Sequence, residues 1–177
     1  MADTFVELLR RNYNEKYGET NVRPALDQLL KTSRAPFDEV SVAFKGAEPR
    51  WQLPLLEAMR ILASTGYCNE TEAEVVLRAT ETVATDSGED EYFKSVNALV
   101  VSPKTAPALT RFISRLLERP VTDDFSRRLA FYTVGMLVEH GEKKLATGLH
   151  DALSSAAATE RSDRLKLQFQ ELLKRLY

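Results

Sequence analysis

Three arginines follow one another at helical spacing in the segment PALTRFISRLLERP, residues 107 to 120. Arg111, Arg115 and Arg119 are each four residues apart and fall on the polar side of the predicted helix. The apolar side is formed by Leu109, Phe112, Ile113 and Leu116. Like charges at this spacing repel one another by a few tenths of a kcal/mol. The row is therefore either a binding surface for a partner or a solvated face that contributes solubility.

Two lysines extend this basic row. Lys143 and Lys144 stand at the start of the next helix of the same kind, whereas Arg78 in the preceding one is flanked by Glu74 and Glu81 and is expected to be paired. The sequence thus offers five candidate partner-binding residues, which are Arg111, Arg115, Arg119, Lys143 and Lys144.

Residue types that support catalysis are scarce and scattered. The two histidines, His140 and His150, are ten residues apart, whereas a metal site needs three or four converging ligands. Cys68 has no general base beside it in sequence and is expected to be a small buried turn residue. The acid pair Asp123 and Asp124 suits a helix start, where carboxylates favour the positive end of the helix dipole. We therefore expect no catalytic residues, no metal, no cofactor and no enzymatic activity.

Composition indicates one folded domain over residues 1 to 177. The chain has a mass of 20.0 kDa and is 44 % hydrophobic, which suffices for a sizeable core. Its formal charge of −2 gives no bulk field that would draw the whole molecule onto nucleic acid or an acidic membrane. The single cysteine excludes an internal disulfide, the first residues lack the layout of a signal peptide, and no apolar run approaches the roughly 20 residues of a membrane span. A cytoplasmic location is expected.

The first fifty residues predict a helical cap. Thr4 and Glu7 have capping-box spacing and begin a helix that Gly18 is expected to end. A second helix fits RPALDQLLKTS, residues 23 to 33. The segment APFDEVSVAFKGAEP, residues 35 to 49, fits a short helix begun by Pro36 about as well as a strand, and helix is favoured because nothing else in the chain would pair with a strand.

From Trp51 onward the helices recur at a near-constant step. Leading helices begin near Trp51, Glu89, Asp124 and Asp163, at separations of 38, 35 and 39 residues. Each is followed by a second helix, which gives about three and a half helical hairpins over residues 51 to 177. Arrays of helical hairpins have steps of about 34 to 47 residues.

The segments LLEAMRILASTG and LAFYTVGMLVEHG share a pattern of large apolar and small residues that ends in a polar turn with glycine. This pattern resembles the first helix of HEAT-like and armadillo-like repeats over residues 51 to 177. The resemblance implies an all-α fold of stacked antiparallel hairpins in an α-α superhelix, with an irregular helical bundle as the alternative. Either fold would bury the predicted helix at 124–140, which is apolar on nearly every side. In HEAT-like arrays the trailing helices line a concave partner-binding surface, which would include the arginine row.

Three classes of function remain open. The first is a non-catalytic protein–protein interaction module, an adaptor or inhibitor such as an immunity protein that binds a toxin or an enzyme. The alternative is a nucleic-acid-binding HEAT-like protein related in build to alkylpurine DNA glycosylases, although such proteins usually carry a strongly basic face. A regulatory subunit with a small ligand in a helical pocket is the third. We expect another protein as the partner and no membrane.

Overall fold

Helices account for nearly all regular structure in the computed structural model, which describes residues 4–16, 18–120, 122–141 and 149–176. The all-α class is confirmed. The helices are α1 Phe5–Arg11, α2 Val22–Thr32, α3 Pro36–Lys45, α4 Pro49–Ala63, α5 Glu70–Ser87, α6 Asp90–Val100, α7 Ala106–Glu118, α8 Asp124–Glu139, α10 His150–Thr159 and α11 Asp163–Arg175. A 3-10 turn, η1 Pro103–Thr105, precedes α7, and two short strands, β1 Tyr13–Asn14 and β2 Glu19–Thr20, form an antiparallel pair.

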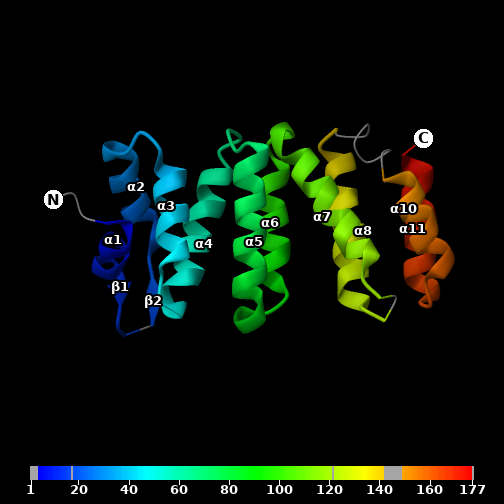
Figure 1. The fold of residues 1–177 in the computed structure, drawn as a ribbon, viewed down its shortest axis with the longest axis horizontal. Helices are drawn as coiled ribbons and strands as arrows, with labels where there is room; N and C mark the ends of the chain where they lie inside the picture. Colours follow the sequence, from blue (N-terminus) through cyan, green and yellow to red (C-terminus); the bar gives the residue numbers. More distant parts are fainter. Residues whose placement is uncertain (1–3, 17, 121, 142–148, 177) are drawn as a thin grey trace.

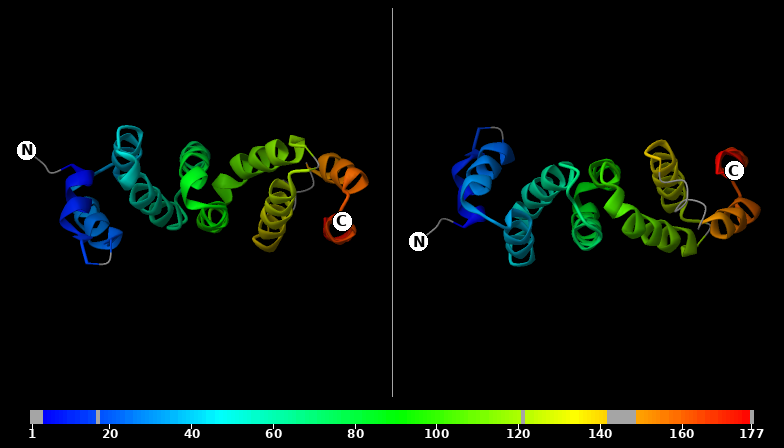
Figure 2. Two further views of the ribbon diagram at one scale, coloured as in Figure 1. Left: turned by 90° about the horizontal axis from the view of Figure 1, so that it is seen from below. Right: turned by 90° about the horizontal axis from the view of Figure 1, so that it is seen from above.

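The helices form an elongated stack with the two chain ends at opposite ends of the molecule (Figure 1). Successive contacts divide them into two rows, which are also seen along the stack in Figure 2. Row A contains α1, α3, α5, α7 and α10, and row B contains α2, α4, α6, α8 and α11. Each helix therefore packs against a chain neighbour in the other row and against the next helix of its own row.

The leading helices predicted near residues 51, 89, 124 and 163 correspond to α4, α6, α8 and α11, all in row B. The tightest pairs differ from the predicted hairpins, because α6 packs mainly on α5 and α8 mainly on α7. The predicted partner of α8 spans residues 142 to 159. Its first seven residues, 142 to 148, lie outside the described residues, and the rest falls in α10, which packs mainly on α11. The N-terminal helices α1, α2 and α3 occupy the same two rows as the rest.

Local signals in the sequence fix many of the helix ends. Thr4 and Glu7 form the expected capping box, and Asn69 and Glu72 form another at the start of α5. Gly88 ends α5 with φ of 92°, a conformation that side chains with a Cβ rarely adopt. Within the ambiguous segment 35–49, Pro36–Lys45 form the helix α3, as favoured.

The expected end of the first helix at Gly18 is wrong. The helix α1 stops at Arg11, where the Asn12 side chain donates a hydrogen bond to the carbonyl oxygen of Leu8. The following residues turn back as the β1–β2 pair, and Gly18 lies in its loop with φ of 65°. The Asn12 side chain donates to a carbonyl oxygen that the backbone N–H of a continued helix would otherwise bind, and the helix therefore ends before it reaches the glycine.

The apolar helix α8 is buried by three neighbours. It packs on α7 of the other row and on α6 and α11 of its own. Leu129, Val134 and Leu137 are essentially inaccessible to water, while Phe131 and Tyr132 are partly covered. A helix with apolar side chains in several directions therefore has a neighbour in each of them.

Candidate binding groove between α4 and α6

The structure brings acidic residues to the predicted arginine row. Arg111 on α7 donates from one guanidinium nitrogen to Glu70 at 2.6 Å, and it also binds Glu74, which lies one turn further along α5. The hydrogen bond from Arg111 lowers the pKa of the Glu74 carboxyl. The charge of Arg111 is thus already met by row A itself.

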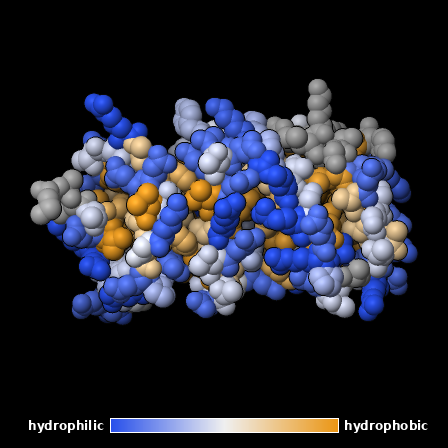
Figure 3. Space-filling view, viewed as in Figure 1, coloured by the Kyte–Doolittle hydropathy of each residue, from blue (hydrophilic) through white to orange (hydrophobic). Residues whose placement is uncertain are grey.

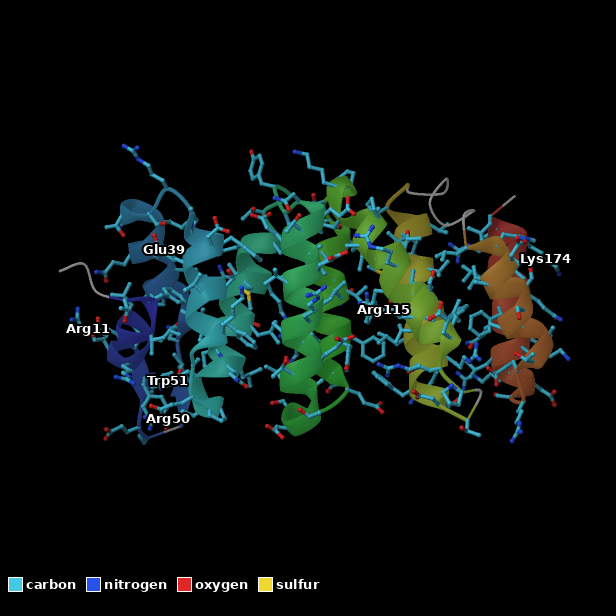
Figure 4. All side chains as sticks on the ribbon, viewed as in Figure 1. Arg11, Glu39, Arg50, Trp51, Arg115 and Lys174 are labelled. Carbon is cyan, nitrogen blue, oxygen red and sulfur yellow. The ribbon has the colours of Figure 1, made fainter. Side chains whose placement is uncertain are left out.

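The other two arginines of the row have neighbours of their own. The Arg115 guanidinium lies 6.0 Å from the ring centroid of Phe112, and Arg119 is 3.7 Å from an Asp123 oxygen. Lys143 and Lys144 lie outside the described residues. Figure 4 shows Arg115 over the α7 region of the stack.

The two rows differ in charge. The described helices of row A hold six Lys and Arg against ten Asp and Glu, a formal charge of −4. Those of row B hold eleven against eight, a formal charge of +3. The face drawn in Figure 3 is largely hydrophilic, and hydrophobic patches show between the hydrophilic side chains in both halves. The surplus of basic residues therefore belongs to row B, whereas the sequence directed attention to α7 in row A.

An open groove of about 1060 Å³ lies in row B between α4, α6 and the β1–β2 pair. Its walls combine apolar, aromatic and charged side chains. The α4 wall includes Arg50, Trp51, Leu53, Pro54, Glu57, Arg60, Ile61 and Ser64, and the α6 wall includes Glu91, Lys94, Asn97 and Ala98.

Trp51 marks the end of the groove nearest the strands, where Figure 4 shows it beside Arg50. The edge of Tyr13 meets the indole at a centroid distance of 6.1 Å. The guanidinium groups of Arg10 and Arg50 lie 5.9 and 5.4 Å from the indole centroid, within cation–π range. Trp51 is only 6 % exposed, and its indole nitrogen has no hydrogen-bond acceptor among the described residues.

A buried ion pair forms the floor of the groove. Arg60 on α4 donates to a carboxylate oxygen of Glu91 on α6 at 2.6 Å and to the Glu91 carbonyl oxygen at 3.0 Å. Both side chains are 5 % exposed. Burial alone would raise the pKa of the Glu91 carboxyl, but hydrogen bonds from Lys94 and Arg60 outweigh it and hold the pKa below its usual value.

The hydrogen bonds of this pair continue into row A. The Nε of Arg60 donates to the Ser95 hydroxyl at 2.9 Å, and the Ser95 and Thr80 hydroxyl oxygens are 2.6 Å apart. Thr80 in turn donates to the carbonyl oxygen of Val76 within α5. One network therefore fixes α4, α5 and α6 relative to one another beneath the groove.

A second, smaller hollow of about 520 Å³ lies further along row B between α6, α8 and α11. Aromatic and basic side chains line it, among them Phe93, Phe131, Tyr132, Arg128 and Arg164. The Tyr132 hydroxyl donates at 2.6 Å to Asn97, which lines the first groove. The two hollows are thus neighbours on one face of the molecule.

The sequence analysis did not predict the groove, because a single charged residue within the apolar face of a helix is not by itself a sign of a binding site. The available signal was Arg60, which stands between the core residues Met59 and Ala63 at a position that faces inward. A second signal was Leu53 beside Pro54, two apolar residues on the otherwise polar side of α4. Leu53 is 39 % exposed.

The cysteine, the acid pair and the histidines considered for chemistry lie in a turn or at helix ends. Cys68 is buried in the connection between α4 and α5, and burial together with the charge of Glu72 raises the pKa of its thiol to about 12. Asp123 caps α8 through Ser126. His140 is exposed at the end of α8, and His150 begins α10 beside Asp151.

The described residues hold neither a cluster of metal ligands nor a membrane-spanning helix. No group of three or more metal-ligating side chains lies close enough together there to hold an ion. Within the same residues, no helix is both long and apolar enough to cross a membrane.

No family model, no curated protein and no solved structure matches the chain.

Proposed function

We propose that this chain is a non-catalytic, HEAT-like module that binds another protein, and that the groove between α4 and α6 is its contact surface. Such a module acts as an adaptor or as an inhibitor, in the manner of an immunity protein that covers a toxin or an enzyme. The observation that carries the proposal is the open groove itself, which combines partly exposed apolar side chains with charged ones on a rigid helical face.

The shape of the groove favours an elongated partner segment over a small molecule. Lining residues recur along α4 from Arg50 to Ser64, which corresponds to about 21 Å of helix. Small-molecule sites enclose most of the surface of their ligand. A groove that stays open along four helical turns instead matches the way in which a helix or an extended peptide lies against a protein surface.

The buried ion pair supports a recognition role for the charged residues. Arg60 and Glu91 hold each other, and Lys94 holds the second oxygen of Glu91 at 2.7 Å. Groups engaged in this way are held in place by their partners and keep their charge, which suits a preorganised binding surface. Two rows of helices fixed by such a network give the rigid, extended surface that repeat proteins use for binding.

Photocrosslinking from within the groove tests this function. A photoreactive amino acid replaces Leu53 in the groove, and the matched control replaces Val42, which is 67 % exposed on α3 in row A. In cells of the source organism we expect one protein to crosslink from position 53 and not from position 42. Identical crosslinked products from both positions, or none from position 53, would contradict the proposal.

The second candidate function is nucleic-acid binding, which is favoured by the hollow between α6, α8 and α11. Phe131 and Tyr132 provide aromatic surface there, and Arg128 and Arg164 provide positive charge, the combination used for single strands. Arg128, however, is already 3.2 Å from Asp124. Binding of a single-stranded oligonucleotide that weakens steeply with salt and is lost in Arg164→Glu would support this second function.

A further inference from the structure

We infer that the groove between α4 and α6 takes an acidic segment of the partner protein, with apolar side chains at its centre and carboxylates toward Arg50 and Lys94. This inference rests on the proposed function and adds the chemistry of the partner. It combines the charge of the groove lining, the arrangement of cations along the groove, and the apolar side chains near them.

The groove and row A differ in the sign of their charge. The groove is lined by three cations, Arg50, Arg60 and Lys94, against two acids, Glu57 and Glu91, whereas the described helices of row A carry a formal charge of −4, so an acidic segment is favoured at the groove over row A. Lys94 and Arg50 are the exposed cations of the groove, with side chains 58 % and 68 % accessible. A basic segment would meet these same two groups as like charges.

The Trp51 end of the groove has more positive than negative charge. Arg10 and Arg50 both approach Glu48, at 3.8 and 3.0 Å, so two guanidinium groups share one carboxylate. A guanidinium has five N–H donors, and one carboxylate cannot accept all those of two arginines. A carboxylate of the partner therefore finds unused donors on Arg50, next to the indole of Trp51.

At the floor of the groove, one carboxylate again serves two cations. Glu91 accepts from Arg60 at one oxygen and from Lys94 at the other. Lys94 is mostly exposed, so two of its three N–H groups remain available toward the groove or solvent. Glu57, which is 48 % exposed, is the acid on the α4 wall and lies 3.4 Å from Arg60.

Apolar side chains lie near these two cations. Leu53 and Pro54 line the α4 wall between its Trp51 end and Arg60, Ile61 follows Arg60 on the same wall, and Ala98 lines the groove from α6. Leu53 is 39 % exposed, which leaves apolar area for the partner to bury. The matching segment therefore carries apolar residues flanked by Asp or Glu.

Selection from a displayed library of random 12-residue peptides tests the inference. The baits are the wild type, an Arg50→Glu, Lys94→Glu double variant, and Lys174→Glu as control. Lys174 is an exposed cation on α11 and lies at the far end of the molecule in Figure 4. Circular dichroism establishes that each bait is folded, and Arg50→Glu alone replaces the double variant if the latter unfolds.

Wild-type selection should enrich peptides of negative net charge with central apolar residues. Their affinity is then measured by the fluorescence of Trp51, the single tryptophan of the chain, which lines the groove. We expect the double variant to bind them at least about tenfold more weakly and Lys174→Glu to bind them as the wild type does.

The possible outcomes separate this inference from the proposed function. Enriched peptides that are basic or uncharged and that lose binding in Leu53→Asp would overturn the acidic partner while leaving the groove as a protein-binding site. Enrichment that is equal for all baits, or no enrichment, overturns both. If a single-stranded oligonucleotide displaces the peptides with the same dependence on Arg50 and Lys94, charge alone governs binding and the peptide inference fails.

Discussion

Two arginine–glutamate contacts each join a helix to the next helix of its row, and they differ in their access to water. In row B, Arg60 of α4 binds Glu91 of α6 at 2.6 Å, and both side chains are 5 % exposed. In row A, Arg111 of α7 binds Glu70 of α5 at 2.6 Å, with both side chains close to half exposed. The chemistry and the step along the chain are alike, whereas the surroundings are opposite.

This difference decides what each contact does. Breaking a buried pair leaves a charge without a partner in a medium of low dielectric, which is costly. An exposed pair gains little, because water and salt already screen its charges. The row B contact therefore fixes the helices beneath the groove, and the row A contact mainly neutralises a surface on which the sequence suggested free arginines.

The largest expected effect follows from breaking the buried pair. Arg60→Ala leaves Glu91 with Lys94 as its remaining cation and removes the donor to Ser95, so the free energy of unfolding should fall by ~3 kcal/mol. Urea denaturation followed by circular dichroism measures it. The double variant Arg60→Met, Glu91→Leu should recover most of the loss, because apolar replacement of both partners leaves no buried charge. A loss for Arg60→Ala below about 1 kcal/mol would show that the pair does not hold the two helices together.

A second expected effect is on the reactivity of Cys68. The thiol is 3 % exposed and its pKa is about 12, so a thiol reagent should label the native protein very slowly at neutral pH. Arg60→Ala should speed labelling by about tenfold or more, since α4 leads directly into the turn that holds Cys68. Arg111→Ala should leave the rate close to that of the wild type. If both variants speeded the labelling of Cys68 equally, the buried and the exposed ion pairs would not differ in how firmly they hold the helices, which would contradict the proposed difference between the rows.

The pH dependence of stability sharpens the comparison further. The pKa of the Glu91 carboxyl is lower in the folded chain than its usual value near 4.5, so the stability it contributes is present above that pH and is lost as the pH falls through the folded pKa. The stability difference between wild type and Glu91→Gln should therefore be constant at neutral pH and shrink in acid below about pH 4.5. Thermal unfolding at a series of pH values measures the difference, and a gap that widens in acid would contradict it.

The smallest expected effect comes from the exposed pair. Arg111→Ala should lower the urea midpoint by roughly one fifth of the change seen for Arg60→Ala, since the side chain is 48 % exposed. In 1 M NaCl that small change should disappear, whereas the effect of Arg60→Ala should persist, because salt does not reach the buried pair. A large, salt-independent effect at Arg111 would mean that row A depends on this contact as much as row B depends on its own.

Much of the fold follows from local signals in the sequence. The apolar periodicity predicts α2 close to its observed bounds and the starts of α4, α6, α8 and α11 within two residues, and Asn69 and Gly88 mark the two ends of α5. The exceptions lie where two local signals compete. Asn12 closes α1 before Gly18 can do so, and the short β1–β2 pair follows because the chain turns back at once.

The candidate site was harder to predict, because it depends on which helices lie side by side. Helical periodicity correctly places Arg111 on an exposed face, but it cannot show that Glu70 and Glu74, about forty residues away, lie within hydrogen-bonding distance. It likewise cannot show that Glu91 lies beside Arg60 in the core. Contacts between residues thirty or more positions apart depend on how the helices pack. The helical period of 3.6 residues shows which face of a helix is apolar, but not which helix lies against that face.

The sequence by itself determined the all-helical class, most helix ends and the apolar character of α8, because these depend on side chains within one or two turns of one another. Only the tertiary structure decided which charges are paired, which row is basic, and where a groove remains open, because each depends on the juxtaposition of helices distant in sequence. Arg60 forms a buried ion pair that joins two helices, whereas Arg111 forms an exposed ion pair screened by water. Only the packing of the helices distinguishes these two arginines.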